Sequence, residues 1–174
     1  MKIQIAYLWD ARSWDVDRGE SVENLELESA EIECSLSKFG NMYLVESYSE
    51  QKTNFAVVDN EIEAVQSFKT ELAYLLYEYQ SNFEEADGRE VAEAERVLGK
   101  YGFQEDMKNA YAILEASGGK VEDVKVKDLV REKYPKYDPD LVEIALSALK
   151  AKGYMEWTVE NHTIYFTIAK KLDF

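Results

Sequence analysis

Two carboxylates and a lysine are the first candidates for a catalytic site. Asp10, Glu50 and Lys52 are the residue types with which metal-dependent nucleases hold a divalent cation and activate a water molecule. The order of the elements expected around them does not suit such a site, and carboxylates are abundant throughout the sequence. A metal-dependent nuclease is therefore the third hypothesis for the function.

Other combinations of metal ligands and nucleophiles fail on spacing. Asp15 and Asp17 open a stretch that resembles a calcium loop, but a glycine falls at its fifth position instead of its sixth, which excludes an EF-hand. Cys34 and His162 are single and far apart, which excludes a zinc site of the Cys and His type. The sequence has no glycine-rich phosphate loop and no nucleophile elbow. We therefore predict a non-enzymatic protein with no catalytic residue, metal or cofactor.

The composition predicts a folded intracellular protein. A chain of 174 residues with 46% hydrophobic residues can bury a core, as one medium domain or two small ones. No apolar run reaches the length of a membrane helix, and residues 1–7 enter a strand pattern instead of a signal peptide. The lone Cys34 fits a reducing compartment. We expect a cytoplasmic protein that does not bind membranes.

Charge is distributed unevenly along the chain. The net charge is −15, and residues 1–104 carry nine Lys and Arg against 22 Asp and Glu, whereas residues 105–174 carry eleven against 13. This asymmetry predicts two parts with different surfaces, and the acidic part is either a solubilising surface or a functional acidic face. The 24 Glu beside five Gln and one His are typical of thermophilic proteins, although acidic mesophilic chains share this composition.

Alternation of apolar and polar residues predicts a sheet in the first part of the chain. In residues 25–36 glutamates fall between apolar residues, so one face of that strand is apolar and the other acidic. Phe39, Gly40 and Asn41 supply a tight turn, and residues 9–23 are expected to form a loop. The result is a four-stranded, mostly antiparallel sheet. Its expected strands are residues 2–8, 25–36, 42–48 and 53–58.

The longest helix is expected at residues 60–82, opened by Asn60 as its N-cap with Glu63 in a capping-box position. Its apolar stripe is wider than one sheet face usually covers. We therefore predict that the stripe contributes to a homodimer or to a tight interdomain contact. The residues assigned to this interface are Val65, Phe68, Leu72, Tyr74, Leu75, Tyr77 and Tyr79.

A shorter helix follows, with Asp87 as its expected N-cap and its end near Gly99. The expected domains are residues 1–83, an acidic α+β domain, residues 84–104, a connecting helix and hinge, and residues 105–174.

Residues 105–174 contain five elements in a characteristic order. A helix is expected at residues 105–117, a short strand at Val124 and Val126, and a second helix at residues 127–134, which Pro135 ends. A third helix follows, with Asp138 as N-cap and Pro139 in its first turn, and ends near Lys152. Two strands, residues 154–159 and 163–169, are joined through a hairpin turn at Glu160, Asn161 and His162. This order resembles the winged helix-turn-helix superfamily, and the overall expectation is an α+β protein.

The resemblance implies how the domain would bind nucleic acid. In that superfamily the third helix usually enters the major groove and the wing meets phosphate or the minor groove. The outward positions of the third helix in this chain are Asp140, Glu143, Ser147 and Lys150. The two carboxylates depart from the superfamily pattern, because they repel phosphates. The residues assigned to nucleic-acid binding are Lys125, Lys127, Arg131, Lys133, Ser147, Lys150 and Lys152, and Lys136, Lys170 and Lys171 are further basic candidates.

Two functions therefore compete. The first is a DNA-binding regulator or accessory factor, which binds double-stranded DNA through the C-terminal winged helix and assembles through the acidic N-terminal domain. The second is a winged-helix module that binds a protein partner in a transcription or replication assembly. Asp140 and Glu143 on the third helix suit the second function, and the superfamily resemblance suits the first.

Overall fold

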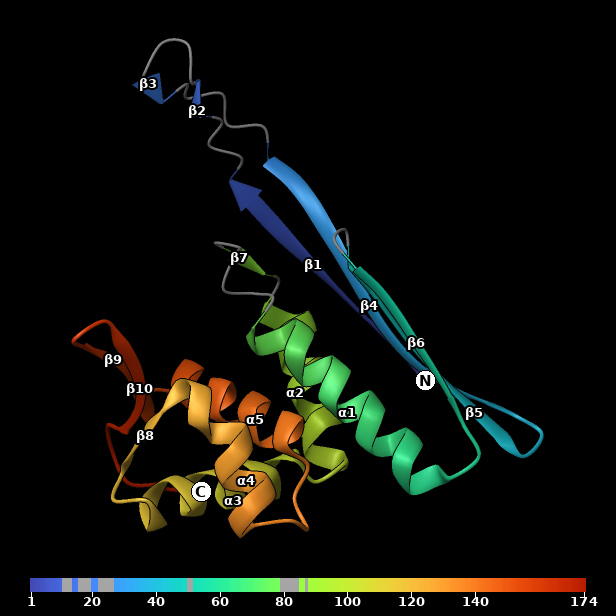
Figure 1. Cartoon of the computed structure of the whole chain (residues 1–174). Helices are drawn as coiled ribbons and strands as arrows, with labels where there is room; N and C mark the ends of the chain where they lie inside the picture. Colours follow the sequence, from blue (N-terminus) through green and yellow to red (C-terminus); the bar gives the residue numbers. More distant parts are fainter. Residues whose placement is uncertain (11–13, 16–19, 22–26, 50–51, 79–84, 87) are drawn as a thin grey trace. The chain divides into compact units, whose positions relative to one another are not determined.

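The computed structural model describes residues 1–10, 14–15, 20–21, 27–49, 52–78, 85–86 and 88–174 (Figure 1). The chain divides into two compact units, Met1–Val97 and Leu98–Phe174. The expected fold class is confirmed. The protein is α+β, with an N-terminal antiparallel sheet and a long helix followed by helices and a wing-like hairpin.

The four expected strands form, and all of them pair antiparallel. They are β1 (Lys2–Asp10), β4 (Leu27–Phe39), β5 (Met42–Ser49) and β6 (Lys52–Val58). The sheet order is β6-β5-β4-β1-β7, in which the two-residue strand β7 (Glu85–Ala86) lies beside β1. Within the expected loop, β2 (Trp14–Asp15) pairs with β3 (Glu20–Ser21), and residues 11–13, 16–19 and 22–23 lie outside the described residues.

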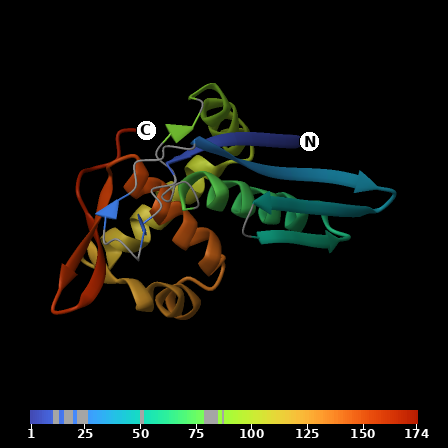
Figure 2. The same ribbon diagram turned by 90° about the horizontal axis from the view of Figure 1, so that it is seen from above.

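Helix α1 (Glu61–Tyr77) begins where the sequence predicts. The Asn60 side chain accepts a hydrogen bond from the backbone N–H of Ile62 at 2.9 Å, which satisfies one of the free donors of the first turn. The helix ends at Tyr77, five residues before the expected end, and residues 79–82 lie outside the described residues. In Figure 2, α1 runs along the strands β4, β5 and β6, which it contacts.

The apolar stripe of α1 is largely taken up within the single chain. Phe68, Leu72 and Leu75 are buried, with 0%, 1% and 3% of their surface exposed, so they are not available to a second chain. Tyr77 is half-buried and its hydroxyl donates a hydrogen bond to Glu95 of helix α2 (Gly88–Lys100) at 3.1 Å. Val65 and Tyr74 are also half-buried, and Tyr79 and Asp87 lie outside the described residues.

Hydrogen bonds join α1 to the sheet. Glu71 accepts hydrogen bonds from the hydroxyl of Ser47 at 2.6 Å and from the amide of Asn54 at 3.2 Å. The thiol of Cys34 donates to the backbone carbonyl of Phe68 at 3.8 Å. Burial, together with the nearby negative charge of Glu71, raises the pKa of the Cys34 thiol far above its ordinary value. This thiol is therefore protonated and shielded behind α1.

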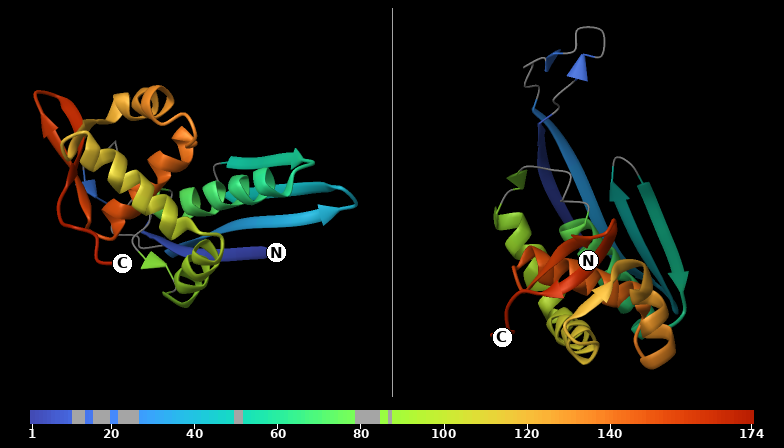
Figure 3. Two further views of the ribbon diagram at one scale, coloured as in Figure 1. Left: turned by 90° about the horizontal axis from the view of Figure 1, so that it is seen from below. Right: turned by 60° about the vertical axis from the view of Figure 1, so that its left-hand side comes forward.

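The second unit has the element order expected from the winged-helix resemblance. Strand β10 pairs with both β8 and β9, which gives a three-stranded sheet of order β8-β10-β9. The hairpin β9–β10 projects from the helices of this unit (Figure 3). The elements are α3 (Phe103–Ala116), β8 (Lys120–Glu122), a 3₁₀ turn (Asp123–Lys125), α4 (Val126–Lys133), α5 (Pro139–Ala151), β9 (Met155–Glu160) and β10 (Thr163–Ile168).

The short strand is not where the sequence predicts it. Val124 lies in the 3₁₀ turn with 74% of its surface exposed, and Val126 is the first residue of α4 and is buried. The strand β8 begins earlier because Gly119, at φ +78°, turns the chain back after α3. Its carbonyl then accepts a hydrogen bond from the N–H of Ile168 at 2.9 Å, and β8 pairs with β10 from Lys120 onward.

The core of the second unit gathers around α5. This helix packs against α3, α4 and β9, and Ala145, Ala148 and Leu149 are fully buried, as their spacing predicts. Phe103 and Phe166 close the core from α3 and β10. Among the described residues, no helix combines the length and the apolar composition needed to cross a membrane.

Candidate functional site

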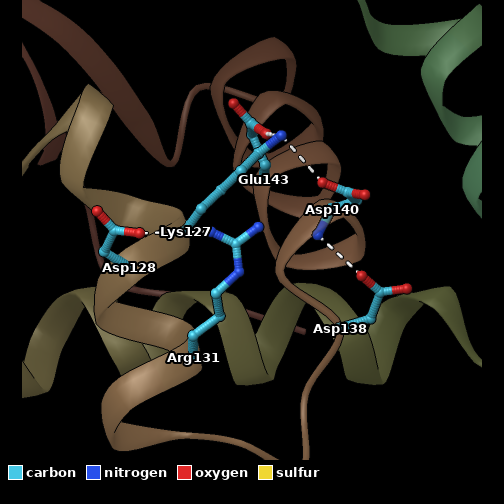
Figure 4. Close-up of polar contacts among 6 residues, drawn as sticks. All are labelled: Lys127, Asp128, Arg131, Asp138, Asp140 and Glu143. Carbon is cyan, nitrogen blue, oxygen red and sulfur yellow. Dashed lines mark hydrogen bonds and ion pairs between the residues drawn. The ribbon is translucent and has the colours of Figure 1, made fainter.

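Three residues that the sequence singled out, Lys127, Asp140 and Glu143, meet at the start of α5. Asp138 caps the helix by accepting a hydrogen bond from the N–H of Asp140 at 2.9 Å, and Pro139 occupies the first turn. This start places Asp140 and Glu143 beside α4. The ammonium of Lys127, on α4, lies 2.9 Å from Asp140 Oδ1 and 2.8 Å from Glu143 Oε2 (Figure 4).

These contacts settle the charge state of Lys127. Hydrogen bonds to Glu143 and then to Asp140 raise the pKa of the ammonium well above its ordinary value. Lys127 is therefore a cation throughout the physiological range, and its charge is already compensated by two carboxylates. The cluster of Lys127, Asp140 and Glu143 has a net charge of −1 and lies at the start of α5, the third helix of the sequence prediction.

Two further basic residues assigned to nucleic-acid binding also have carboxylate partners. Lys125 forms an ion pair with Glu122, and Arg131 Nη1 lies 3.3 Å from Asp128 Oδ1 (Figure 4). Both pairs join residues three positions apart in the chain, which is the spacing at which side chains of one helical turn meet. Each of these two cations therefore already has a carboxylate partner, with which a phosphate would have to compete.

The remaining assigned residues have different environments. Lys150 lies over the ring of Trp157, with its ammonium 3.4 Å from the ring centroid, a cation–π contact that joins the end of α5 to the wing. Lys133 is exposed and Lys152 is half-buried.

The outward position predicted for Ser147 is wrong. Ser147 is buried, with 6% of its surface exposed, together with every residue of Leu141–Leu149 except Glu143. The reason is that α5 is the central helix of its unit, packed by α3, α4 and β9 around most of its circumference. The sequence pattern predicts a broad solvent-exposed side for this helix. In the structure the exposed side is much narrower.

One face of the wing is apolar along its whole length. Trp157 lies opposite Phe166 and Val159 lies opposite Ile164, and opposite residues of an antiparallel pair share a face. Phe166 is buried at the base, but Trp157, Val159 and Ile164 are 49%, 69% and 40% exposed. The sequence assignment missed this face. The signal was present, because residues 155, 157 and 159 are all apolar and continue to the hairpin tip, beyond what a three-helix core covers.

The other face of the wing is polar and acidic. Lys120, on β8, forms an ion pair with Glu160 at 2.5 Å and lies 4.4 Å from the ring centroid of Tyr165. The wing strands and their turn, residues 155–168, contain Glu156 and Glu160 and no Lys or Arg. At the tip, Asn161 and His162 have φ values of +49° and +65°, which confirms the hairpin turn that the sequence predicts.

Two of the three residues of the nuclease hypothesis are far apart in the sheet. Asp10 ends β1 and Lys52 begins β6, with β4 and β5 between these strands in the sheet. The register aligns Lys52 with Ser49, and Asp10 with Leu27, so the two backbone positions are on the order of 20 Å apart. Glu50 lies outside the described residues. Within the described part of the chain, no three His, Cys, Asp or Glu side chains form a group that could hold a metal ion.

Comparison of the chain with protein-family models, with curated proteins and with solved structures gives no match. Its residues and their geometry are therefore the basis for a functional proposal.

Proposed function

We propose that the C-terminal unit is a winged-helix module that binds a protein partner, and that the chain is a non-enzymatic accessory factor of the cytoplasm. The cluster of Lys127, Asp140 and Glu143 carries this proposal. At the start of α5, the helix that a DNA-binding member would place in the major groove, two carboxylates neutralise the nearest cation and leave a net negative charge.

The wing supports the same function. A wing that contacts phosphate needs cations, since phosphate affinity comes from Lys and Arg that displace counterions. This wing offers Glu156 and Glu160 on its polar face and the exposed Trp157, Val159 and Ile164 on the other. An apolar strip with an exposed tryptophan is typical of the central contacts of protein interfaces.

Binding of double-stranded DNA is the second candidate. It is supported by the element order of the unit and by its charge balance of twelve Lys and Arg against 13 Asp and Glu in Leu98–Phe174, beside eight against 22 in Met1–Val97. Lys133 and Lys150 are exposed and could meet phosphate. A DNA-binding function would need Lys127 to leave at least one of its two carboxylates.

The test is binding of the full chain to fluorescent duplex DNA at roughly 20 mM salt, where electrostatic attraction is strongest. The unaltered protein is expected to give no saturable binding. The double variant Asp140→Asn with Glu143→Gln removes two negative charges and releases Lys127, so it is the most favourable form for binding phosphates. It is expected to gain at most weak binding that disappears at physiological salt.

Binding of the unaltered chain to DNA would contradict the proposal. If the unaltered chain binds duplex DNA at low salt, and replacing Lys125, Lys127, Lys150 or Lys152 singly lowers the salt slope by about one, the DNA-binding function replaces the one proposed.

A second experiment addresses the wing directly. A photo-crosslinking amino acid at Val159, which is 69% exposed, is expected to form adducts in cells that protease removes and nuclease does not. The matched control carries the same amino acid at the exposed Lys171, outside the wing. Adducts at Val159 that nuclease removes would contradict a protein partner.

A further inference from the structure

Several exposed apolar side chains of the first unit lie on its sheet. In the register of β4, β5 and β6, Cys34 lies opposite Ser47 and Val45 lies opposite Ala56, on the side that faces α1. The intervening residues belong to the other face, because successive residues of a strand point to opposite sides. The apolar members of this second face, which we call the outer sheet face, are Phe39, Met42, Leu44, Tyr48, Phe55 and Val57.

These side chains are exposed to a degree that is unusual for a sheet. Phe39, Met42, Tyr48, Phe55 and Val57 expose 63%, 41%, 50%, 77% and 56% of their surface. An antiparallel sheet with one solvated face normally alternates apolar residues with polar ones. In β6 the exposed side chains of Phe55 and Val57 are apolar and that of Thr53 is polar, and Val57 lies opposite Leu44 of β5.

The size of this surface is that of an interface. If each aromatic side chain presents about 200 Å², the exposed fractions of Phe39, Tyr48 and Phe55 alone amount to roughly 400 Å². The largest apolar patch on a monomer is typically about 300–600 Å² and is often functional. A stable interface buries about 800 Å² on each partner, so these aromatics with Met42 and Val57 supply most of the requirement.

The charge of this face decides which partner fits it. Among the described side chains, the charged residues of the outer sheet face are Lys2, Glu33 and Glu46, and Lys2 forms an ion pair with Glu33. The described part of this face therefore carries one cation against two carboxylates, whereas Met1–Val97 carries eight Lys and Arg against 22 Asp and Glu. Two copies of so acidic a chain repel each other, and the described part of this face adds little to that repulsion.

We propose that the outer sheet face packs against the same face of a second copy of this chain, and that the protein is a homodimer through its sheets. A two-fold axis brings the same patch of both copies together, so the patch needs to complement only itself. The two sheets would lie about 10 Å apart with their apolar side chains interdigitated. The proposal concerns the first unit and does not depend on the partner of the C-terminal module.

Two substitutions and a matched control test the interface. Phe55→Thr combined with Val57→Thr removes exposed apolar surface and keeps residues that suit a strand, so the fold is retained. The control is Ile62→Thr on α1, because Ile62 is also 77% exposed but lies outside the outer sheet face. Sedimentation of the full chain between roughly 1 and 100 µM gives the dissociation constant of each form.

The unaltered chain of 20.1 kDa is expected to sediment as a dimer. The Phe55→Thr with Val57→Thr variant is expected to dissociate at least about a hundredfold more readily, whereas Ile62→Thr dissociates like the unaltered chain. Glu46→Gln is expected to strengthen the dimer, because it removes the carboxylate within the outer sheet face from both copies.

Radical oxidation of the unaltered chain gives a readout that needs no variant. The oxidation of Met42, Tyr48 and Phe55 is expected to fall as the protein concentration rises through the dissociation constant.

A monomer at every concentration overturns the proposal and leaves the face to a partner of another kind. A dimer that survives Phe55→Thr with Val57→Thr also overturns it, because the contact then lies elsewhere. Oxidation of Phe55 that does not depend on concentration has the same meaning.

Discussion

The two units of the chain treat charge in opposite ways. In Leu98–Phe174 cations and carboxylates are nearly equal in number, and Lys125, Lys127 and Arg131 each lie within ion-pair distance of a carboxylate. In Met1–Val97 carboxylates exceed cations by almost three to one, yet the described exposed side chains of the outer sheet face are mostly apolar. The number of charges in a segment therefore does not say which charges are free to contact a partner.

The largest expected effect tests whether each unit has its own core. Phe68 in the first unit and Phe166 in the second are almost fully buried, so replacing either by Ala is expected to lower the stability of its unit by about 3–5 kcal/mol. Hydrogen exchange read by segment should show Phe166→Ala speeding exchange in β9 and β10 while β4 and β5 remain protected. Phe68→Ala should give the reverse. Equal acceleration in both units by either variant would contradict separate cores.

Two helices with side-chain N-caps give a matched pair of smaller effects. Asn60 caps α1 and Asp138 caps α5, each accepting one backbone hydrogen bond at 2.9 Å. Asn60→Ala and Asp138→Ala are each expected to destabilise their own unit by about 1 kcal/mol, measured as a shift of its urea midpoint. Replacement by Gly, which tolerates the cap conformation, should be much milder and serves as the control. A cap variant that leaves its midpoint unchanged would show that the capping bond contributes nothing.

The two hairpin turns are expected to respond in opposite directions. The β4–β5 turn uses Gly40 at φ +60°, whereas the wing turn holds His162 at φ +65°, a conformation unfavourable for residues with a Cβ. Gly40→Ala is expected to destabilise the first unit by about 1 kcal/mol, and His162→Gly to stabilise the second by about as much. Thermal unfolding of the two variants checks both signs. A loss of stability in His162→Gly would mean that the imidazole contributes contacts that outweigh the strain.

The smallest effect is the pH dependence of the Lys127 cluster. The pKa of Lys127 is raised in the folded chain, so its stabilisation is complete below its ordinary value of 10.5 and is lost as the pH rises through the folded value. Because the side chain is 41% exposed, the contribution is expected to be below about 1 kcal/mol. The stability difference between the unaltered chain and Lys127→Gln should therefore persist at neutral pH and shrink above pH 10.5. Lys171→Gln is the control, and a difference that grows with alkaline pH would contradict the sign.

The fold was predictable where one local signal decided it. Asn60 and Asp138 announce their helices, and the alternation in residues 42–48 and 53–58 gives β5 and β6 to within a residue. The strand expected at Val124 failed because pairing with β10, a contact between distant parts of the chain, begins at Lys120, directly after the turn at Gly119. Local periodicity carries no information about such a partner.

The candidate site was predictable only in part. The sequence singled out Asp140 and Glu143 as a departure from a DNA-reading helix, and the structure adds that Lys127 reaches both across a helix boundary. The burial of Ser147 could not be predicted, because it depends on how many elements surround α5. The apolar wing face could have been found, since register and alternation together determine which residues share a face.

The buried thiol of Cys34 is a probe of how often α1 separates from the sheet. Its sulfur is 1% exposed and hydrogen-bonded to the carbonyl of Phe68, so a reagent in solution can reach it only while α1 stands away from the sheet. When closing is faster than labelling, the observed rate equals the intrinsic thiol rate multiplied by the fraction of time spent open. Cys34 is the only cysteine in the chain, so the labelling rate would report the fraction of time that this one helix spends away from the sheet.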